Sequence, residues 1–225
     1  MKIESEINSV HSFKKGEDCT SLFKKAYENR YTWSSLFNGY SGAFIYKSND
    51  QTFNGLFNIN CDLKSNVEII NQPEIKKILE AQLWEVSIHR VRRPFGEVHG
   101  QNTFVAGEFN QLGLEVIVGG KNNGDSYRVN NNIVTMVNRH IHGKVIQIIT
   151  ESTLDTGNGY LSTSYTSQYK DTTSNSFSGE INRFSDSYQK LSNSEFWVLD
   201  YRKIITLAEN QQIKKVQEFI FKDFK

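Results

Sequence analysis

Residues 143–169 read GKVIQIITESTLDTGNGYLSTSYTSQY, and this stretch decides the fold class. It contains two runs, 143–154 and 159–169, that are rich in the β-branched and aromatic residues favoured by strands. Gly157-Asn158-Gly159 stands between the runs and is typical of a hairpin turn. We therefore predict two neighbouring antiparallel strands here.

The same pattern continues on both sides of this hairpin. Beyond residue 101, the other candidate strands are 102–109, 113–119, 125–130, 132–139, 177–190, 196–208 and 213–222. Turn residues separate them at a spacing of roughly 8–15 residues with no helical segment between, which excludes βαβ units and favours an antiparallel meander. Three shorter segments between residues 40 and 70 also have the period of strands.

Two helices are predicted in the first half of the chain. Asp18 is a suitable N-cap for a helix near 19–32. Pro73 suits the first turn of a second helix near 74–93, and Pro94 would end that helix. The apolar stripe of the second helix comprises Ile75, Ile78, Leu79, Leu83 and Val86.

These elements predict a mainly β fold of the α+β type. About ten strands in one meander must curl or split, so we expect a curled antiparallel sheet or open barrel with both helices packed over it. Residues 18–225 would form a single domain, and the polar residues 1–17 would form a flexible tail.

Composition narrows the class of protein. Lys and Arg total 26 and Asp and Glu total 25, so the formal charge of +1 argues against nucleic-acid binding. Cys19 and Cys61 are the only cysteines and form no CxxC pair. No segment resembles a signal peptide or approaches the roughly 18 apolar residues of a transmembrane helix. We therefore expect a cytoplasmic protein or one in another reducing compartment.

Several strings resemble a known family. They are residues 26–33 (AYENRYTW), 82–93 (QLWEVSIHRVRR), 134–143 (VTMVNRHIHG), 155–161 (DTGNGYL) and 217–221 (QEFIF). Together they resemble a family of cyanobacterial and chloroplast proteins known only as a domain of unknown function. The resemblance implies an oxygenic photosynthetic organism or a plastid stroma, and supplies no catalytic residues. The chain departs from the family pattern at Asn38, where a proline commonly precedes Gly-Tyr.

The order of helices and curled sheet is also similar to lipoprotein-carrier half-barrels. This second likeness concerns architecture alone, because one fold can support many functions.

Basic residues follow the second predicted helix. Arg90, Arg92 and Arg93 lie close together in sequence, and Arg139 lies on a predicted strand. Guanidinium groups bind carboxylate or phosphate with two parallel hydrogen bonds, so these four could form a pocket for an anionic head group. Alternatively, the three that follow the helix could simply interact with the last carbonyl groups of that helix.

Four histidines suggest a metal site. His140 and His142 stand two residues apart on a predicted strand and would point to the same side. His89 and His99 could supply further ligands, because imidazole binds Zn, Cu, Fe and Ni. The alternative is that His140 and His142 are two ordinary exposed or hydrogen-bonded side chains at the end of a strand. The sequence identifies no cofactor.

Aromatic residues gather near the predicted junctions between helix and sheet. They are Trp33, Tyr40, Phe44, Trp84 and Phe95. Such residues could line an apolar cavity or could simply fill the core.

Three functions remain open at this point. The chain contains no recognisable catalytic motif, so we expect a non-enzymatic protein that binds or carries an apolar or amphipathic ligand, such as a lipid or a pigment. The alternative is an assembly factor that binds a protein of the photosynthetic apparatus. A metal-dependent enzyme that uses the four histidines is the third.

Overall fold

The computed structural model describes residues 18–141, 143–174 and 176–225, so the predicted tail, 1–17, lies outside the described residues. The helices are α1 (Cys19–Glu28), α2 (Pro73–Ile88) and α3 (Phe95–His99). The strands are β1 (Gly39–Ser48), β2 (Gln51–Asn60), β3 (Ser65–Glu68), β4 (Asn102–Asn110), β5 (Gly113–Gly120), β6 (Ser126–Asn130), β7 (Ile133–Ile141), β8 (Lys144–Asp155), β9 (Tyr160–Lys170), β10 (Phe177–Lys190), β11 (Trp197–Leu207) and β12 (Ile213–Lys222).

All the strands belong to one antiparallel sheet with the order β3-β2-β1-β12-β11-β10-β9-β8-β7-β6-β5-β4. The expectation of about ten strands is therefore wrong, because the sheet has 12. The difference arises because β1 pairs with β12, from Ala43↔Lys222 to Ser48↔Gln217, and so adds the three early strands to the late meander. The strands β3 and β4 stand at opposite ends of this order and do not pair with each other. The sheet is therefore open, which agrees with the predicted curled or open antiparallel sheet.

The hairpin of β8 and β9 lies within one residue of its predicted bounds. Gly157 (φ +82°) and Gly159 (φ +114°) both have the left-handed backbone that favours glycine. The Asp155 carboxylate accepts a hydrogen bond from the Gly157 amide at 2.8 Å, which stabilises the turn. At Gly159 a Cβ atom would lie 2.6 Å from the Asn29 carbonyl oxygen, so the turn also needs glycine for close packing.

The first helix begins where the sequence predicts, with Asp18 as its N-cap. The Asp18 side chain accepts a hydrogen bond from the Ser21 amide at 3.3 Å. The helix ends at Glu28, not near residue 32. The chain turns there because the Tyr31 amide donates to the Tyr160 carbonyl and the Tyr160 amide to the Asn29 carbonyl, each at 2.9 Å.

The second helix ends at Ile88, five residues before its predicted end. Beyond it, the Arg90 carbonyl accepts a hydrogen bond from the Trp33 amide at 2.8 Å, so this segment binds the chain that leads from α1 to β1. Pro94, predicted to end the helix, instead precedes the short helix α3, which the sequence did not predict. Because proline fixes its own φ and supplies no amide hydrogen, it suits the start of a helix as well as the end of one.

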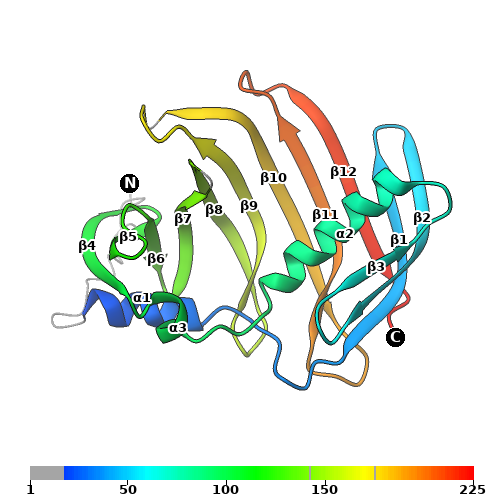
Figure 1. Cartoon of the computed structure of the whole chain (residues 1–225), viewed down its shortest axis with the longest axis horizontal. Helices are drawn as coiled ribbons and strands as arrows, with labels where there is room; N and C mark the ends of the chain where they lie inside the picture. Colours follow the sequence, from blue (N-terminus) through cyan, green and yellow to red (C-terminus); the bar gives the residue numbers. More distant parts are fainter. Residues whose placement is uncertain (1–17, 142, 175) are drawn as a thin grey trace, which may run out of the picture.

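The helices form two groups, α2 alone and α1 with α3. Both groups lie on the same face of the sheet, which we call the helix face (Figure 1). Directly paired residues in an antiparallel sheet point to the same side. One row of pairs, Tyr46↔Phe219 and Phe219↔Arg202, lies on the side that α2 covers. On β5 and β6, toward the β4 end of the sheet, helix-face residues such as Val116 and Tyr127 lie under α1 and α3.

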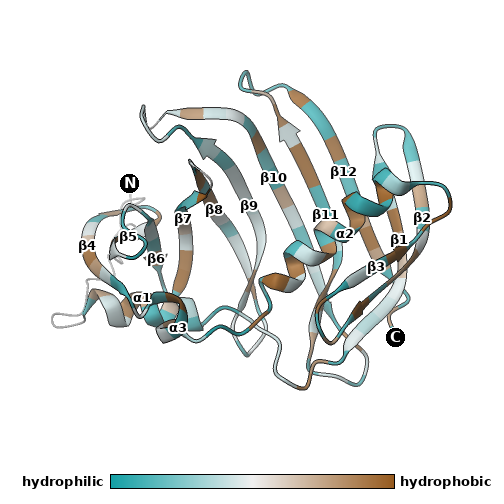
Figure 2. Cartoon of the chain, in the orientation of Figure 1, coloured by the Kyte–Doolittle hydropathy of each residue, from teal (hydrophilic) through white to brown (hydrophobic). Residues whose placement is uncertain are grey.

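Two hydrophobic cores result from this arrangement. The first packs Leu79, Leu83 and Val86 of α2 against aromatic residues such as Phe44 and Phe219. The second packs α1 and α3 against β5 to β7. Figure 2 shows apolar residues along α2 and on β7, while β9 between the two cores is more polar. The first core takes in β8 and β9 only near their shared turn, through Leu154 and Leu161, while farther along these strands Ile146 and Ile148 are half-buried.

Candidate functional site

The basic segment that follows α2 divides its side chains between two places. Arg90 reaches β10, where its Nη2 donates to the Tyr188 hydroxyl at 3.2 Å. Arg92 and Arg93 instead line a pocket beside the turns that join β8 to β9 and β10 to β11, at the ends of these strands. The structure therefore does not gather these three arginines into the single cluster that the sequence predicted.

Beside Arg90 lies a buried ion pair that the sequence did not predict. Arg202 on β11 and Asp186 on β10 are direct partners in the sheet, and the exposed fractions of these residues are 2% and 6%. The Arg202 Nε and Nη2 donate to the two Asp186 carboxylate oxygens at 2.9 and 2.7 Å. This bidentate geometry is among the stronger hydrogen-bond arrangements in proteins.

Neighbouring residues satisfy the remaining donors of Arg202. Its Nη1 donates to the Gln82 side chain of α2 at 2.9 Å and lies 3.4 Å from the Glu85 carboxylate. Its Nη2 also donates to the Tyr165 hydroxyl at 2.9 Å. Arg202 thus connects α2 with three strands and is neutralised by carboxylates, which indicates a structural role.

Arg90 is less completely satisfied than Arg202. Its Nε is buried and has no hydrogen-bond partner within the described part of the chain. The Tyr188 hydroxyl that Arg90 contacts lies 3.3 Å from an Asp186 carboxylate oxygen and 3.2 Å from the Ser162 carbonyl oxygen. Burial raises the pKa of Tyr188 to about 12, so this phenol stays protonated.

His89 is the C-cap residue of α2 and directly precedes Arg90. Although part of the residue is open to solvent, surrounding protein atoms desolvate its ring. This desolvation lowers the pKa of His89 to about 4, and the nearby cations lower it further in the order Arg90, Arg30, Arg202 and Arg139. The imidazole of His89 is therefore neutral at neutral pH.

Arg139 lies on β7 at the border of the open part of the helix face. Its partner Ile146 and the neighbouring pair Val137↔Ile148 establish which face Arg139 occupies. The Arg139 side chain is 51% exposed, and its Nε lies 3.8 Å from an Asp125 carboxylate oxygen. Although Asp125 is buried, half of the Arg139 side chain is exposed, so part of its guanidinium is accessible to a ligand.

Between Arg139 and the first core, the helix face carries half-buried apolar residues. We call this area the central stretch; it comprises Ile146, Ile148, Tyr165 and Phe184. The rings of Tyr165 and Phe184 stack with centroids 4.5 Å apart. Serine and threonine side chains of β9 make the surrounding surface polar. The central stretch is thus apolar and incompletely covered.

The histidines are dispersed in the described part of the chain. His99 is buried in the second core, where desolvation, followed by the charges of Arg139 and Arg30, lowers its pKa to about 4. His140 instead contacts Asp125, with Nδ1 3.1 Å from the carboxylate. His142 lies outside the described residues. Within residues 18–141, 143–174 and 176–225, no group of three potential ligands is placed to hold a metal ion.

The aromatic residues mostly fill the cores, which was the alternative to a cavity. Trp33, Tyr40 and Phe44 are buried in the first core, and Phe95 packs beside α1 in the second. Trp84 is 56% exposed on α2. The pairing of β1 with β12 brings distant aromatic rings together under α2, and they fill that space themselves. Only Trp33 of these five residues also lines the pocket beside the β8–β9 and β10–β11 turns.

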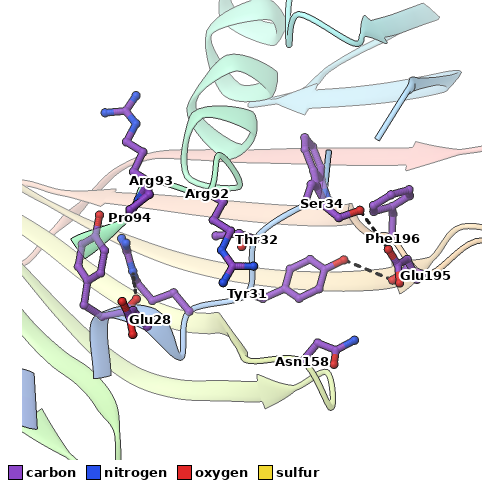
Figure 3. A pocket seen from close by; sticks show the side chains of 13 residues that line it. Glu28, Tyr31, Thr32, Ser34, Arg92, Arg93, Pro94, Asn158, Glu195 and Phe196 are labelled. Carbon is purple, nitrogen blue, oxygen red and sulfur yellow. Dashed lines mark hydrogen bonds between the residues drawn. The ribbon is translucent and has the colours of Figure 1, made fainter. Parts of the chain in front are cut away.

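That pocket, which we call the end pocket, has a volume of about 450 Å³. Its main polar residues are Arg30, Thr32, Arg92, Asn158 and Glu195. Figure 3 shows Arg92 pointing toward Tyr31, while Arg93 points away from the other labelled side chains. Arg30 was not among the predicted site residues, although it lies within one of the strings that resemble the family.

Comparison with known families gives a clear assignment. The family model described as "Protein of unknown function (DUF3386)" matches residues 14–225, so this chain belongs to the DUF3386 family. The search of curated proteins gave no significant match. Among solved structures, the chain is similar to a LolA superfamily protein from Nitrosomonas europaea, with 8% identity, coverage of 93% of each chain and a TM-score of 0.31.

One further observation concerns membranes. Among the described residues, none of the helices combines the length and the apolar character needed to cross a membrane.

Proposed function

We propose that this protein binds or carries an amphipathic ligand, with an apolar body on the central stretch and an acidic group beside His89, Arg90 and Arg139. The observation that carries this proposal is the 51% exposed side chain of Arg139 on the helix face, to which Arg90 adds a buried Nε that has no hydrogen-bond partner within the described residues. Arg139 adjoins the half-buried Ile146 and Ile148, so cations border an apolar surface. An acidic group would gain charge-assisted hydrogen bonds there while its apolar body covered these side chains.

The organism and compartment that we propose for this function rest on the sequence alone. The strings at residues 26–33, 82–93 and 134–143 resemble proteins of cyanobacteria and chloroplasts. We therefore propose a role in the cytoplasm or plastid stroma of a photosynthetic organism, with a lipid or pigment as ligand. Arg92 and Arg93, which the sequence assigned to the same head group, are not part of this site.

A second candidate function is the assembly of a protein complex. The observation that favours it is Trp84, which exposes 56% of its surface on α2, since tryptophan is enriched at the centres of protein interfaces. A stoichiometric partner that is captured by the native chain and lost with Trp84→Ala would support this function. Capture unaffected by Trp84→Ala would contradict it.

The carrier proposal is tested by mass spectrometry of the full chain purified gently from a photosynthetic host. We expect an added mass in the native spectrum that appears in an organic extract. Arg139→Gln should reduce its occupancy, because the cation nearest the open surface is lost. The matched control is Arg183→Gln, an exposed arginine whose partners Ile205 and Thr166 place it on the opposite face of the sheet.

Two outcomes would contradict the carrier proposal. One is an unmodified mass under gentle conditions together with no saturable binding of an added fluorescent fatty acid. The other is equal loss of ligand in Arg139→Gln and Arg183→Gln, which would mean that position on the helix face does not matter.

A further inference from the structure

We infer that the end pocket is a second binding site, separate from the helix face, and that it takes the phosphate group of an organic phosphate monoester. The inference goes beyond the carrier proposal and does not depend on it. It rests on four observations: the end pocket itself, hydrogen-bond donors without a partner among the described residues, the charged residues of the lining, and the volume of the pocket.

The end pocket is formed by segments that are far apart in the sequence. The chain between α1 and β1 provides Arg30 and Thr32, the segment between α2 and α3 provides Arg92, and the β8–β9 hairpin provides Asn158. Backbone hydrogen bonds hold two of these segments together, since the Trp33 amide donates to the Arg90 carbonyl at 2.8 Å. The backbone of these two segments is therefore held in place before any ligand enters, which reduces the cost of ordering it.

The guanidinium of Arg30 is held in place at the pocket wall. Its Nε donates to the Tyr27 carbonyl at 2.9 Å, and its Cζ lies 3.8 Å from the centre of the Tyr27 ring. These contacts occupy one nitrogen and one face of the guanidinium group. The two terminal nitrogens of Arg30 make no hydrogen bond with the described residues, so they can still donate to an oxyanion.

Three further donors are free among the described residues. The side chains of Thr32, Arg92 and Asn158 make no hydrogen bond or ion pair there, and Arg92 points toward Tyr31 across the pocket (Figure 3). By contrast, the Tyr31 hydroxyl accepts from the Trp197 amide at 2.9 Å, and the Trp33 Nε1 donates to the Trp197 carbonyl at 3.0 Å. The aromatic polar groups thus support the wall, while the arginine, hydroxyl and amide donors remain available.

The charged residues that line the pocket have a formal total of +1, which favours an anion; they are Arg30, Arg92, Arg93, Glu28 and Glu195. Glu28 pairs with Lys24 at 4.0 Å, and the Glu195 carboxylate accepts from the Ser34 hydroxyl at 3.1 Å. Neither carboxylate forms an ion pair with Arg30 or Arg92. A phosphate monoester carries a charge of about −1.5 to −2 at neutral pH and three acceptor oxygens, which matches two guanidinium groups that approach from different segments.

The volume indicates that the phosphate carries an organic group. A pocket of about 450 Å³ falls within the range of small-molecule sites and exceeds the needs of a lone phosphate ion. Tyr31, Pro94 and Phe196 supply apolar wall surface for such a group. The ester could come from a soluble metabolite or from a phospholipid head group, because the chemistry of recognition is the same.

The test is a calorimetric titration of the full chain with three probes. They are glucose 6-phosphate, inorganic phosphate, and vesicles that contain phosphatidic acid. We expect one ester source to bind in a saturable manner and more tightly than inorganic phosphate. Binding of the sugar phosphate identifies a soluble source, and binding of the vesicles alone identifies a lipid source.

Variants connect that binding to the end pocket. Arg92→Gln should weaken the tighter ester at least roughly tenfold, since charge-assisted hydrogen bonds are lost. The control Arg183→Gln should stay within about twofold of the native chain. Arg139→Gln should also leave the ester affinity unchanged, which separates failure of this inference from failure of the carrier proposal.

Three results would overturn the inference. They are the absence of saturable binding by either ester source, equal affinity for inorganic phosphate and the ester, and unchanged ester affinity in Arg92→Gln. An ester affinity that falls with Arg139→Gln but not with Arg92→Gln would place the ester on the helix face instead.

Discussion

Arg202 and Arg92 represent two opposite uses of arginine in this molecule. Arg202 is 2% exposed and has hydrogen-bond partners in α2, β9 and β10, including a bidentate pair with Asp186. Arg92 is exposed and has no hydrogen-bond or ion-pair partner among the described residues. The difference teaches that a cluster of basic residues has no single meaning. A neutralised, buried guanidinium holds elements together, and an unpaired one in a pocket is available to a ligand.

The largest effect that would sharpen this comparison comes from Asp186→Leu. This change leaves the Arg202 charge buried without its main partner, so we expect a loss of about 3–5 kcal/mol in the free energy of unfolding, measured by urea denaturation. The double variant Asp186→Leu/Arg202→Met should recover much of that loss, because no buried charge remains. A loss below about 1 kcal/mol for Asp186→Leu would show that the pair does not hold the fold.

A smaller effect concerns the pH dependence of stability. His99 has a pKa of about 4 in the folded chain against an ordinary value of 6.5. The unfolded chain therefore binds the proton more readily, and stability should fall as the pH drops from about 6.5 to about 4. His99→Gln should make this fall shallower in urea titrations at several pH values, although His89 has the same direction of shift and retains part of it.

The control for the pH prediction is Arg183→Gln, which should follow the native pH profile. Identical slopes for the native chain and His99→Gln would mean that His99 titrates normally, and would contradict the desolvation that, ahead of the charges of Arg139 and Arg30, lowers its pKa.

The smallest effect should come from Arg92→Gln. Because this side chain has no partner among the described residues, the free energy of unfolding should change by less than about 0.5 kcal/mol in the urea experiment. The result matters because it contrasts with the Asp186 variant in the same assay. A loss comparable to that of Asp186→Leu would break the comparison and make Arg92 structural as well.

Local features of the fold could be predicted from sequence, and longer-range ones could not. The β8–β9 hairpin and the Asp18 N-cap depend on neighbouring residues, and both predictions are confirmed. The predicted number of strands in the sheet was wrong because it depends on the pairing of β1 with β12, which are separated by most of the chain. The predicted end of α2 was wrong because the segment that follows the helix binds the chain before β1, through the hydrogen bond between Trp33 and Arg90. No local sequence pattern predicts that contact.

The candidate site shows the same limit. Sequence analysis identified Arg90, Arg92 and Arg139 as basic residues of interest, but it could not divide them between two places. It also missed Asp186 and Arg202, because only the pairing of β10 with β11 reveals that they oppose each other. The proposed ligand contacts of these arginines remain predictions.

The sequence by itself determined the class of fold, the hairpins and the family, because these follow from local composition, turn residues and strings of neighbouring residues. The tertiary structure was needed to show that the sheet has 12 strands, that the helices cover two separate cores, and that Arg92 has no partner among the described residues while Arg202 is neutralised. The physical reason is that charge balance and burial depend on which distant segments meet. A residue has the same identity in the sequence whether or not a carboxylate faces it in the folded chain.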